Sequence, residues 1–195
     1  AVLKQQVARL EQAGMRTAMA TELEFFLFRE SFETLHAGGY RNMETISPYN
    51  EDYHIFQTTK EEDVMRAIRN GLQGAGIPVE NSKGEAETGQ EELNIRYAEA
   101  LLCADHHTLA KQAIKEIADQ HGHAATFMPK WHHDKVGSAA HIHQSLMAGD
   151  ESAFHDASAT LTMSDTMRAY VAGLLKYSSD MTFFLAPYVN SYKRF

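Results

Sequence analysis

The stretch ATELEFFLF, residues 20–28, alternates polar and apolar side chains at its start and is rich in phenylalanine. This pattern is typical of a β-strand. Successive side chains of a strand point to opposite faces, so Glu22, Glu24, Phe26 and Phe28 share one face. We therefore predict a strand whose carboxylate end lines a site and whose aromatic end enters a core.

The segments around this strand predict further helices and strands. Helices are predicted at 2–14, 58–74, 99–120 and from residue 164 onward. The signals are apolar side chains at helical spacing, a capping box from Thr58 to Glu61 and a cap at Ser164. Strands are expected at 77–82, 90–97, 123–131 and 139–146, with a long loop over 30–57 and a turn-like end, NSYKRF. The last helix carries an apolar stripe, formed by Met167, Tyr170, Val171, Leu174 and Leu175. The order predicts an α+β fold in which an antiparallel sheet lines the active site and helices flank it.

Composition narrows the class of protein. The chain has 195 residues, 44% of them hydrophobic, and a formal net charge of −8, which suits one globular core and argues against a nucleic-acid partner. No apolar run approaches the ~20 residues that span a bilayer, so no membrane partner is expected. Cys103 is the only cysteine, which excludes an internal disulfide and favours a reducing, cytoplasmic setting.

A second group of carboxylates lies in KGEAETGQEE, residues 83–92, which holds four glutamates and two glycines. A glycine-containing turn lets the backbone bring carboxylates from both arms together, here Glu85 and Glu92. Oxygen ligands favour hard cations such as Mg²⁺ or Mn²⁺. Taken alone, an acidic turn of this kind is more often a solvated surface feature than a metal site.

Histidines and cationic side chains follow in the last third of the chain. His141 and His143 lie two residues apart in AAHIHQSL, residues 139–146, so both share one face of the predicted strand. This pair is interpreted either as a polar surface patch or as a metal or phosphate site. The adjacent His132 and His133 are interpreted as loop or surface. The loop KVGS, residues 135–138, and the guanidinium of Arg194 are suited to an anionic ligand.

Taken in order, five motifs resemble the catalytic domain of the glutamine synthetase family, from about residue 18 to 195. They are ELEFFLF, GE-x-x-x-GQ-x-E, TFMPKW, GS-x-x-H-x-H-x-SL and NSYKR. The stretches SPYNEDYHIF, EDVMRAIRNGL and FMPKWH look closest to the bacterial γ-glutamyl-amide synthetases, which join glutamate to ammonia or to an organic amine.

The resemblance implies a site for two or more Mg²⁺ or Mn²⁺ ions. One ion takes Glu24, Glu85 and Glu92, and another takes Glu22 and His141. The positions that match the family's nucleotide-binding residues are Glu80, Tyr97, His143 and Ser145. Those that match its glutamate-binding residues are Val136, Gly137 and Arg194. The positions that match its catalytic group are Glu24, Glu85, Glu92, His141 and Arg194.

Two positions depart from the family pattern. Thr88 stands where proline is frequent, which loosens the turn. Val136 stands where many members have asparagine, so one side-chain contact to glutamate is expected to be missing.

The resemblance implies an ATP-dependent ligase that joins the γ-carboxylate of L-glutamate to ammonia or an amine through a γ-glutamyl phosphate. It also implies a ring-shaped homo-oligomer with sites between subunits. Residues 1–195 are expected to be a partial catalytic domain without the family's N-terminal β-grasp domain and later segments, and to be inactive alone. Two alternatives are a non-catalytic metabolite-binding or regulatory member of the family, and an unrelated two-metal hydrolase.

Overall fold

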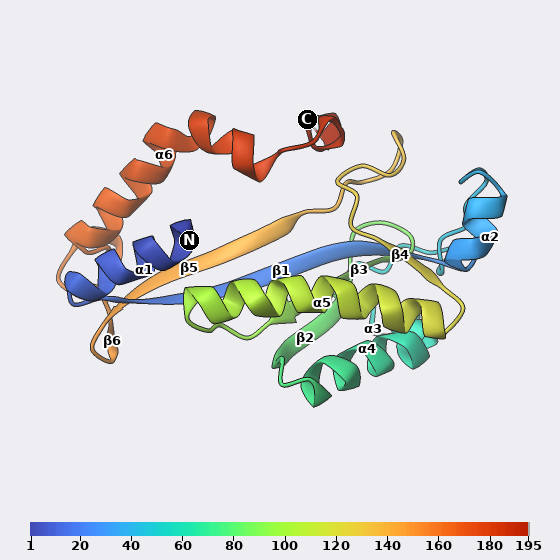
Figure 1. Cartoon of the computed structure of the whole chain (residues 1–195), viewed down its shortest axis with the longest axis horizontal. Helices are drawn as coiled ribbons and strands as arrows, with labels where there is room; N and C mark the ends of the chain where they lie inside the picture. The colour runs from blue at the N-terminus through green and yellow to red at the C-terminus, as the bar shows by residue number, and fades with distance from the viewer. Residues whose placement is uncertain (195) are drawn as a thin grey trace.

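The computed structural model describes residues 1–194, and its centre is one long strand in a six-stranded sheet (Figure 1). This strand, β1 (Arg16–Phe28), pairs with β3 (Gln90–Ile95) on one side and with β5 (Ala140–Ala148) and β4 (Ala124–Thr126) on the other. The outer strands are β2 (Val79–Gly84) and β6 (Glu151–Ser152). Each of these pairings is antiparallel, so the predicted sheet type is confirmed.

Two helices, α4 (Glu62–Gly74) and α5 (Ala100–Gln120), cover one face of the sheet (Figure 1). The apolar side chains that β1 sends to this face, Leu23, Phe25 and Leu27, are fully buried with those of both helices. Burying one such side chain stabilises the fold by about 1.5–3 kcal/mol. The start of α5 is fixed by Glu99, whose carboxylate accepts hydrogen bonds from the Leu101 amide and the Thr17 hydroxyl. The shorter helix α1 (Val2–Gln12) leads into β1.

The other face of β1 also ends in a core. Phe26 and Phe28 are buried with Leu35 and Ala124, and the ring of Trp131 packs edge-on against both phenylalanines. The prediction that the Glu22–Glu24 face continues into an aromatic core is therefore confirmed. This core fixes one end of the polar face.

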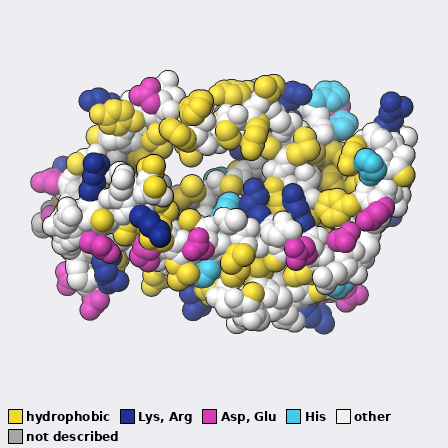
Figure 2. All heavy atoms as spheres, viewed as in Figure 1, with side chains coloured by type: hydrophobic (Ala, Val, Ile, Leu, Met, Phe, Trp, Pro, Cys, Tyr) yellow, Lys and Arg dark blue, Asp and Glu magenta, His cyan; other side chains and the backbone are white. Residues whose placement is uncertain are grey.

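The last long helix, α6 (Asp165–Leu185), begins as predicted, because the Ser164 hydroxyl accepts a hydrogen bond from the Met167 amide. In Figure 1 it lies on the side of the sheet opposite α4 and α5. None of its residues is buried, and Leu175 is 73% exposed. Figure 2 shows an opening between α6 and the sheet. Of the apolar stripe, Tyr170 packs its ring against Phe154, with the ring centroids 5.1 Å apart, whereas Leu175 is left largely exposed.

Several expectations about the connecting segments are wrong. Residues 30–57 contain α2 (Phe32–Ala37), which Ser31 caps, and most of α3 (Ile55–Thr58), which His54 caps. The capping box does not form, because Thr58 is already helical and its hydroxyl donates to the Ile55 carbonyl. A 3-10 turn, η1 (Thr59–Glu61), instead precedes α4.

Element ends also differ from the expected ones. β1 begins at Arg16 rather than residue 20, because it pairs with β5 back to that point. The strand expected over 123–131 is limited to β4, and the backbone from Phe127 onward is irregular. The chain includes two further 3-10 segments, η2 (Thr160–Thr162) and η3 (Val189–Arg194), the second in place of the expected turn. No helix within residues 1–194 has the length and apolar character needed to cross a bilayer.

Candidate active site

The register of the sheet places carboxylates and imidazoles on one face. Glu22 of β1 lies opposite His141 of β5, and Glu24 lies opposite Glu92 of β3. Directly opposed residues in antiparallel strands project to the same side. Glu22 and Glu24 alternate along β1 with Leu23 and Phe25, whose side chains are buried under α4 and α5. The carboxylates therefore project from the opposite face of the sheet.

The first group on this face contains Glu22, Glu24 and His141, each of which offers a ligand atom within 4.8 Å of the other two. Nδ1 of His141 and Nε2 of His143 each lie 2.9 Å from a different oxygen of Glu22. Partial burial acts to raise the pKa of Glu22, but the hydrogen bonds from His143 and His141 outweigh it and lower the pKa to about 2. Glu22 therefore holds a negative charge at neutral pH.

The second group contains Glu24, Glu85 and Glu92, whose ligand oxygens also lie within 4.8 Å of one another. Glu92 is 1% exposed and Glu24 is 9% exposed. Burial, reinforced by the neighbouring Glu92, raises the pKa of Glu85 to about 7. Glu24 belongs to both groups and lies between them.

The donor set suits hard divalent cations. The five predicted ligands supply four carboxylates and one imidazole, a mixture that Mg²⁺ and Mn²⁺ accept. The ammonium of Lys83 forms an ion pair with Glu92 and lies 3.9 Å from Glu85, and it neutralises only part of this charge. The structure thus brings all five residues together, and ion binding by them stays a prediction.

Glu24 and Glu92 are held by hydrogen bonds from residues that sequence reasoning did not assign to the site. The Ala139 amide donates to Oε2 of Glu24 at 2.8 Å, and the Gln90 side chain donates to the same oxygen at 3.4 Å. Asn94 donates to Oε1 of Glu92 at 2.6 Å. Gln90, Glu92 and Asn94 are spaced two residues apart and so share one face of β3, and this spacing is the sequence signal that could have identified Gln90 and Asn94.

The turn between β2 and β3 is tied to the loop before β5. The Lys135 ammonium lies 3.0 Å from Oε1 of Glu87, and the Val136 amide donates to the other oxygen of Glu87. Thr88 uses the amide that a proline would lack, because its N–H donates to Oε1 of Glu87 at 2.9 Å. Thr88 therefore supplies hydrogen bonds within the turn that a proline could not make.

The residues that match glutamate-binding positions meet at the end of the face. A Cβ atom on Gly137 would lie 2.5 Å from the Pro129 carbonyl oxygen and 2.9 Å from Cγ of Arg194, so only glycine fits there. Arg194 lines a pocket that also contains Glu24 and His141. Val136, next to Gly137, is 44% exposed.

Three of the four residues that match nucleotide-binding positions line a second pocket, further along the same face. They are Tyr97, His143 and Ser145. His143 lies opposite Ala20, and Ser145 lies opposite Ala18, so small side chains of β1 leave room beside Glu22. Glu80 is exposed beside a β-bulge of β2 and is not among the residues that line this pocket.

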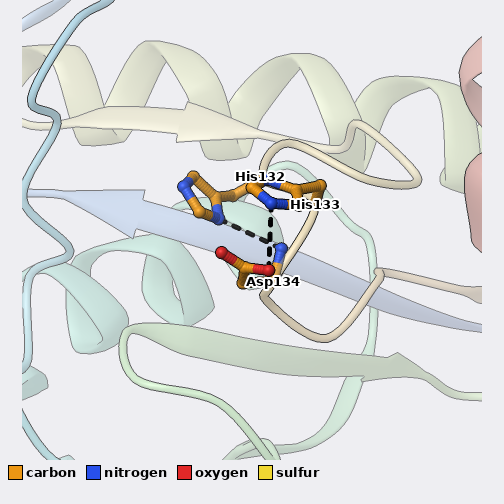
Figure 3. A group of neighbouring side chains, drawn as sticks. All are labelled: His132, His133 and Asp134. Carbon is orange, nitrogen blue, oxygen red and sulfur yellow. Dashed lines mark hydrogen bonds and ion pairs between the residues drawn. The ribbon is translucent and has the colours of Figure 1, made fainter.

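A third group of possible ligands, His132, His133 and Asp134, lies in the loop after β4 (Figure 3). All three residues are exposed. His133 and Asp134 form an ion pair at 3.0 Å, and Nδ1 of His132 accepts a hydrogen bond from the Asp134 amide. The prediction that these histidines lie in a loop at the surface is confirmed.

Comparison with known proteins identifies the family. Residues 1–195 match the glutamine synthetase catalytic domain. A gamma-glutamylethanolamide synthetase of Streptomyces coelicolor is 40% identical over 100% of this chain and 41% of its own length. A glutamate–isopropylamine ligase of Pseudomonas is 32% identical over 99% of this chain and 42% of its own length. The chain thus spans about two fifths of these curated relatives.

Solved structures agree with these matches. Ligand-free GmaS superposes with a TM-score of 0.85 at 30% identity, over 98% of this chain and 44% of that one. Plasmodium falciparum glutamine synthetase shares the fold, with a TM-score of 0.81 at 24% identity over 99% of this chain and 42% of that one. The fold, the ordered motifs and the match over the whole sequence together show that this chain belongs to the glutamine synthetase family.

Proposed function

We propose that a protein containing this chain is an ATP-dependent ligase that joins the γ-carboxylate of L-glutamate to an amine. The observation that supports this most strongly is the arrangement of Glu22, Glu24 and His141 beside Glu85 and Glu92. This acidic face has a pocket at each end, one lined by Arg194 and the other by His143. Two anionic substrates can therefore approach one cation-binding face from opposite ends.

The acidic face fits the charge requirements of this reaction. Mg²⁺ or Mn²⁺ ions held by the five ligands would offset the negative charge of ATP and of the glutamate carboxylate. The chain's own part is to hold the carboxylates in place, through the Ala139 amide, Gln90 and Asn94. Preorganised ligands of this kind need no rearrangement when a substrate binds.

Arg194 and Gly137 account for glutamate orientation in this proposal. A guanidinium binds a carboxylate through two parallel hydrogen bonds, and the close approach of Gly137 fixes where the Arg194 side chain lies. The γ-carboxylate can then face the ion site and accept the terminal phosphoryl group of ATP. The resulting γ-glutamyl phosphate has a better leaving group than a free carboxylate, and an amine displaces that phosphate.

His143 and Ser145 account for the nucleotide in this proposal. Both lie on the pocket beside Ala18 and Ala20, next to the imidazole-bound Glu22. Tyr97 contributes an exposed aromatic ring to the same pocket, and aromatic rings are suited to stack on a base. ATP bound there would direct its phosphates along β1 toward Glu22 and Glu24.

We also propose a cytoplasmic, ring-shaped homo-oligomer with sites between subunits, because the family resemblance implies it. Exposed apolar side chains on α6, including Leu175, Phe183 and Phe184, support burial of this helix against further protein. The free, buried thiol of Cys103 is compatible with a reducing compartment.

The experiment that tests the proposal also identifies the amine substrate. The names of the two curated relatives refer to an ethanolamide and to isopropylamine. The test is to incubate the purified protein with ATP, Mg²⁺ and glutamate across ammonium and a panel of organic amines, and to detect each γ-glutamyl amide by mass spectrometry. A product with ammonium alone would define a glutamine synthetase, and one with an organic amine would define a γ-glutamyl-amide synthetase. Absence of every amide would contradict the proposal and favour a non-catalytic member of the family.

A further inference from the structure

A second set of carboxylates lies on the other side of the sheet. Glu91 is next to Glu92 in β3, but it lies opposite Phe25 and so faces the helix-covered side. It meets Glu61, at the end of η1, and Glu51, in the loop before α3. Each of the three offers an oxygen within 4.8 Å of the other two.

This carboxylate triad is buried and poorly hydrogen-bonded. Glu51, Glu61 and Glu91 are 0%, 5% and 1% exposed. One oxygen of each, Oε2 of Glu51, Oε2 of Glu61 and Oε1 of Glu91, has no hydrogen-bond partner. The Gly89 amide donates to the other oxygen of Glu51 at 3.0 Å. Buried polar atoms without partners are rare in proteins, so these three oxygens require either protons shared between the carboxyl groups or a bound ligand.

No basic side chain within residues 1–194 forms an ion pair with the triad. Arg69, whose positive charge acts on Glu91, pairs instead with Glu62 and donates a hydrogen bond to the Ser82 hydroxyl. Lys60 donates to the side-chain oxygen of Gln57 instead. Three carboxylates in a buried site must therefore be neutralised by protons or by a cation from solution.

The pKa shifts show how costly the ionised triad is without a cation. Burial raises the pKa of Glu51. Burial and the Glu51 charge raise the pKa of Glu61 to about 7. Carboxylate oxygens in this number are the usual ligands of hard divalent cations.

We propose that Glu51, Glu61 and Glu91 bind one hard divalent cation, of the Ca²⁺, Mg²⁺ or Mn²⁺ class, at a site separate from the active-site face. Of the three, Glu61 also lines a surface pocket, together with Lys60 and His123. The proposal does not depend on the ligase function, because it uses none of the active-site ligands.

The position of the triad gives the ion a structural role. A Cβ on Gly84 would lie 2.4 Å from Cβ of Glu51, so the loop with Glu51 packs tightly under the β2–β3 hairpin. That hairpin carries Glu85 and Glu92, and Glu91 lies within it. An ion bound by Glu51, Glu61 and Glu91 would therefore link the β2–β3 hairpin to η1 on the helix-covered side of the sheet.

The test separates this site from the active-site face. The full chain carrying Glu22→Gln and Glu85→Gln, which weakens both active-site groups, is dialysed against Mn²⁺, and free Mn²⁺ is counted by electron paramagnetic resonance. We expect this double variant to retain about one ion per chain. Adding Glu61→Gln is expected to weaken that binding at least about tenfold. Asp63→Asn, which removes an exposed acid two residues away, is the matched control and leaves binding unchanged.

A second measurement needs no change in the triad. Mn²⁺ added to the double variant should broaden the amide NMR signals of Glu61 and Gly89 before that of His143, because bound Mn²⁺ relaxes nearby nuclei. Broadening that begins at His143, an absence of bound Mn²⁺ in the double variant, or undiminished binding after Glu61→Gln would each overturn the proposal.

Discussion

Glu24 on β1 and Glu92 on β3 lie directly opposite each other, with both carboxylates almost fully buried. Like charges in this arrangement repel unless donors or cations hold them. Glu24 accepts from the Ala139 amide and Gln90, whereas Glu92 is paired with Lys83 and Asn94. The face is therefore built around two carboxylates that protein donors stabilise, and one of them, Glu24, belongs to both groups of possible ligands.

Lys83 competes with a cation for Glu92. Burial acts to lower the pKa of Lys83, but the ion pair with Glu92 outweighs it and raises the pKa. We expect Lys83→Met to lower the free energy of unfolding of the metal-free chain by about 1–3 kcal/mol, because Glu92 loses its partner. The same variant should bind Mn²⁺ more tightly. Urea unfolding in chelator and a Mn²⁺ titration check both effects, with exposed Lys4→Met as control, and weaker Mn²⁺ binding would contradict the competition.

Glu85 makes the stability of the metal-free chain depend on pH. Its pKa is raised from 4.5 to about 7, so the folded chain holds this proton more tightly than the unfolded chain does. Its contribution to stability is therefore full below pH 4.5 and is lost as the pH rises through about 7. We expect Glu85→Gln to reduce the loss of stability across this window, measured by urea unfolding in chelator. An unchanged pH profile, matching that of the exposed control Glu11→Gln, would show that Glu85 is not perturbed.

Arg194 is expected to act on glutamate and not on ATP. Arg194→Lys keeps the charge but loses the planar pair of donors. The KM for glutamate should rise about 10- to 100-fold, because a hydrogen bond to a charged group contributes about 1.5–3 kcal/mol. Steady-state kinetics with each substrate varied in turn measures this, and Lys193→Arg is the neighbouring control. A rise in the KM for ATP of similar size would contradict the assignment.

Ala18 is expected to set the space for the nucleotide. It lies on the pocket floor opposite Ser145 and is only half-buried, so a larger side chain there fills the pocket without entering the core. Ala18→Leu should weaken ATP binding at least about tenfold through steric exclusion, a cost of about 1.4 kcal/mol or more. Ala18→Ser, which adds little volume, is the control. Isothermal titration with ATP measures both, and equal affinities would place the nucleotide elsewhere.

Strand alternation is strict, so the sequence predicted which of the candidate ligands share one face of a strand. Once residues 20–28 form a strand, Glu22 and Glu24 must share a face, and the same argument groups His141 with His143. Alternation within single strands does not give the register, so the opposition of Glu24 and Glu92 needed the structure. Lys83 was missed for that reason, since its link to Glu92 depends on how β2 pairs with β3.

Other features depend on packing between distant segments. Thr58 has the residues of a capping box, but the preceding α3 already includes it, so the local signal failed. Glu51 and Glu61 come from a stretch expected to be loop and capping box, and nothing local indicated that they meet Glu91. The α6 stripe has a helical period, yet periodicity alone does not supply a partner to bury it.

The most direct test of the ligase account is whether phosphate release from ATP requires glutamate. The full-length protein that contains this chain is assayed with Mg²⁺ and its accepted amine, with and without glutamate, beside a Glu24→Gln variant. The account predicts that release depends on glutamate and falls at least about 100-fold in the variant, because Glu24 serves both ion groups. Phosphate release that continues without glutamate, or at an undiminished rate in Glu24→Gln, would contradict it.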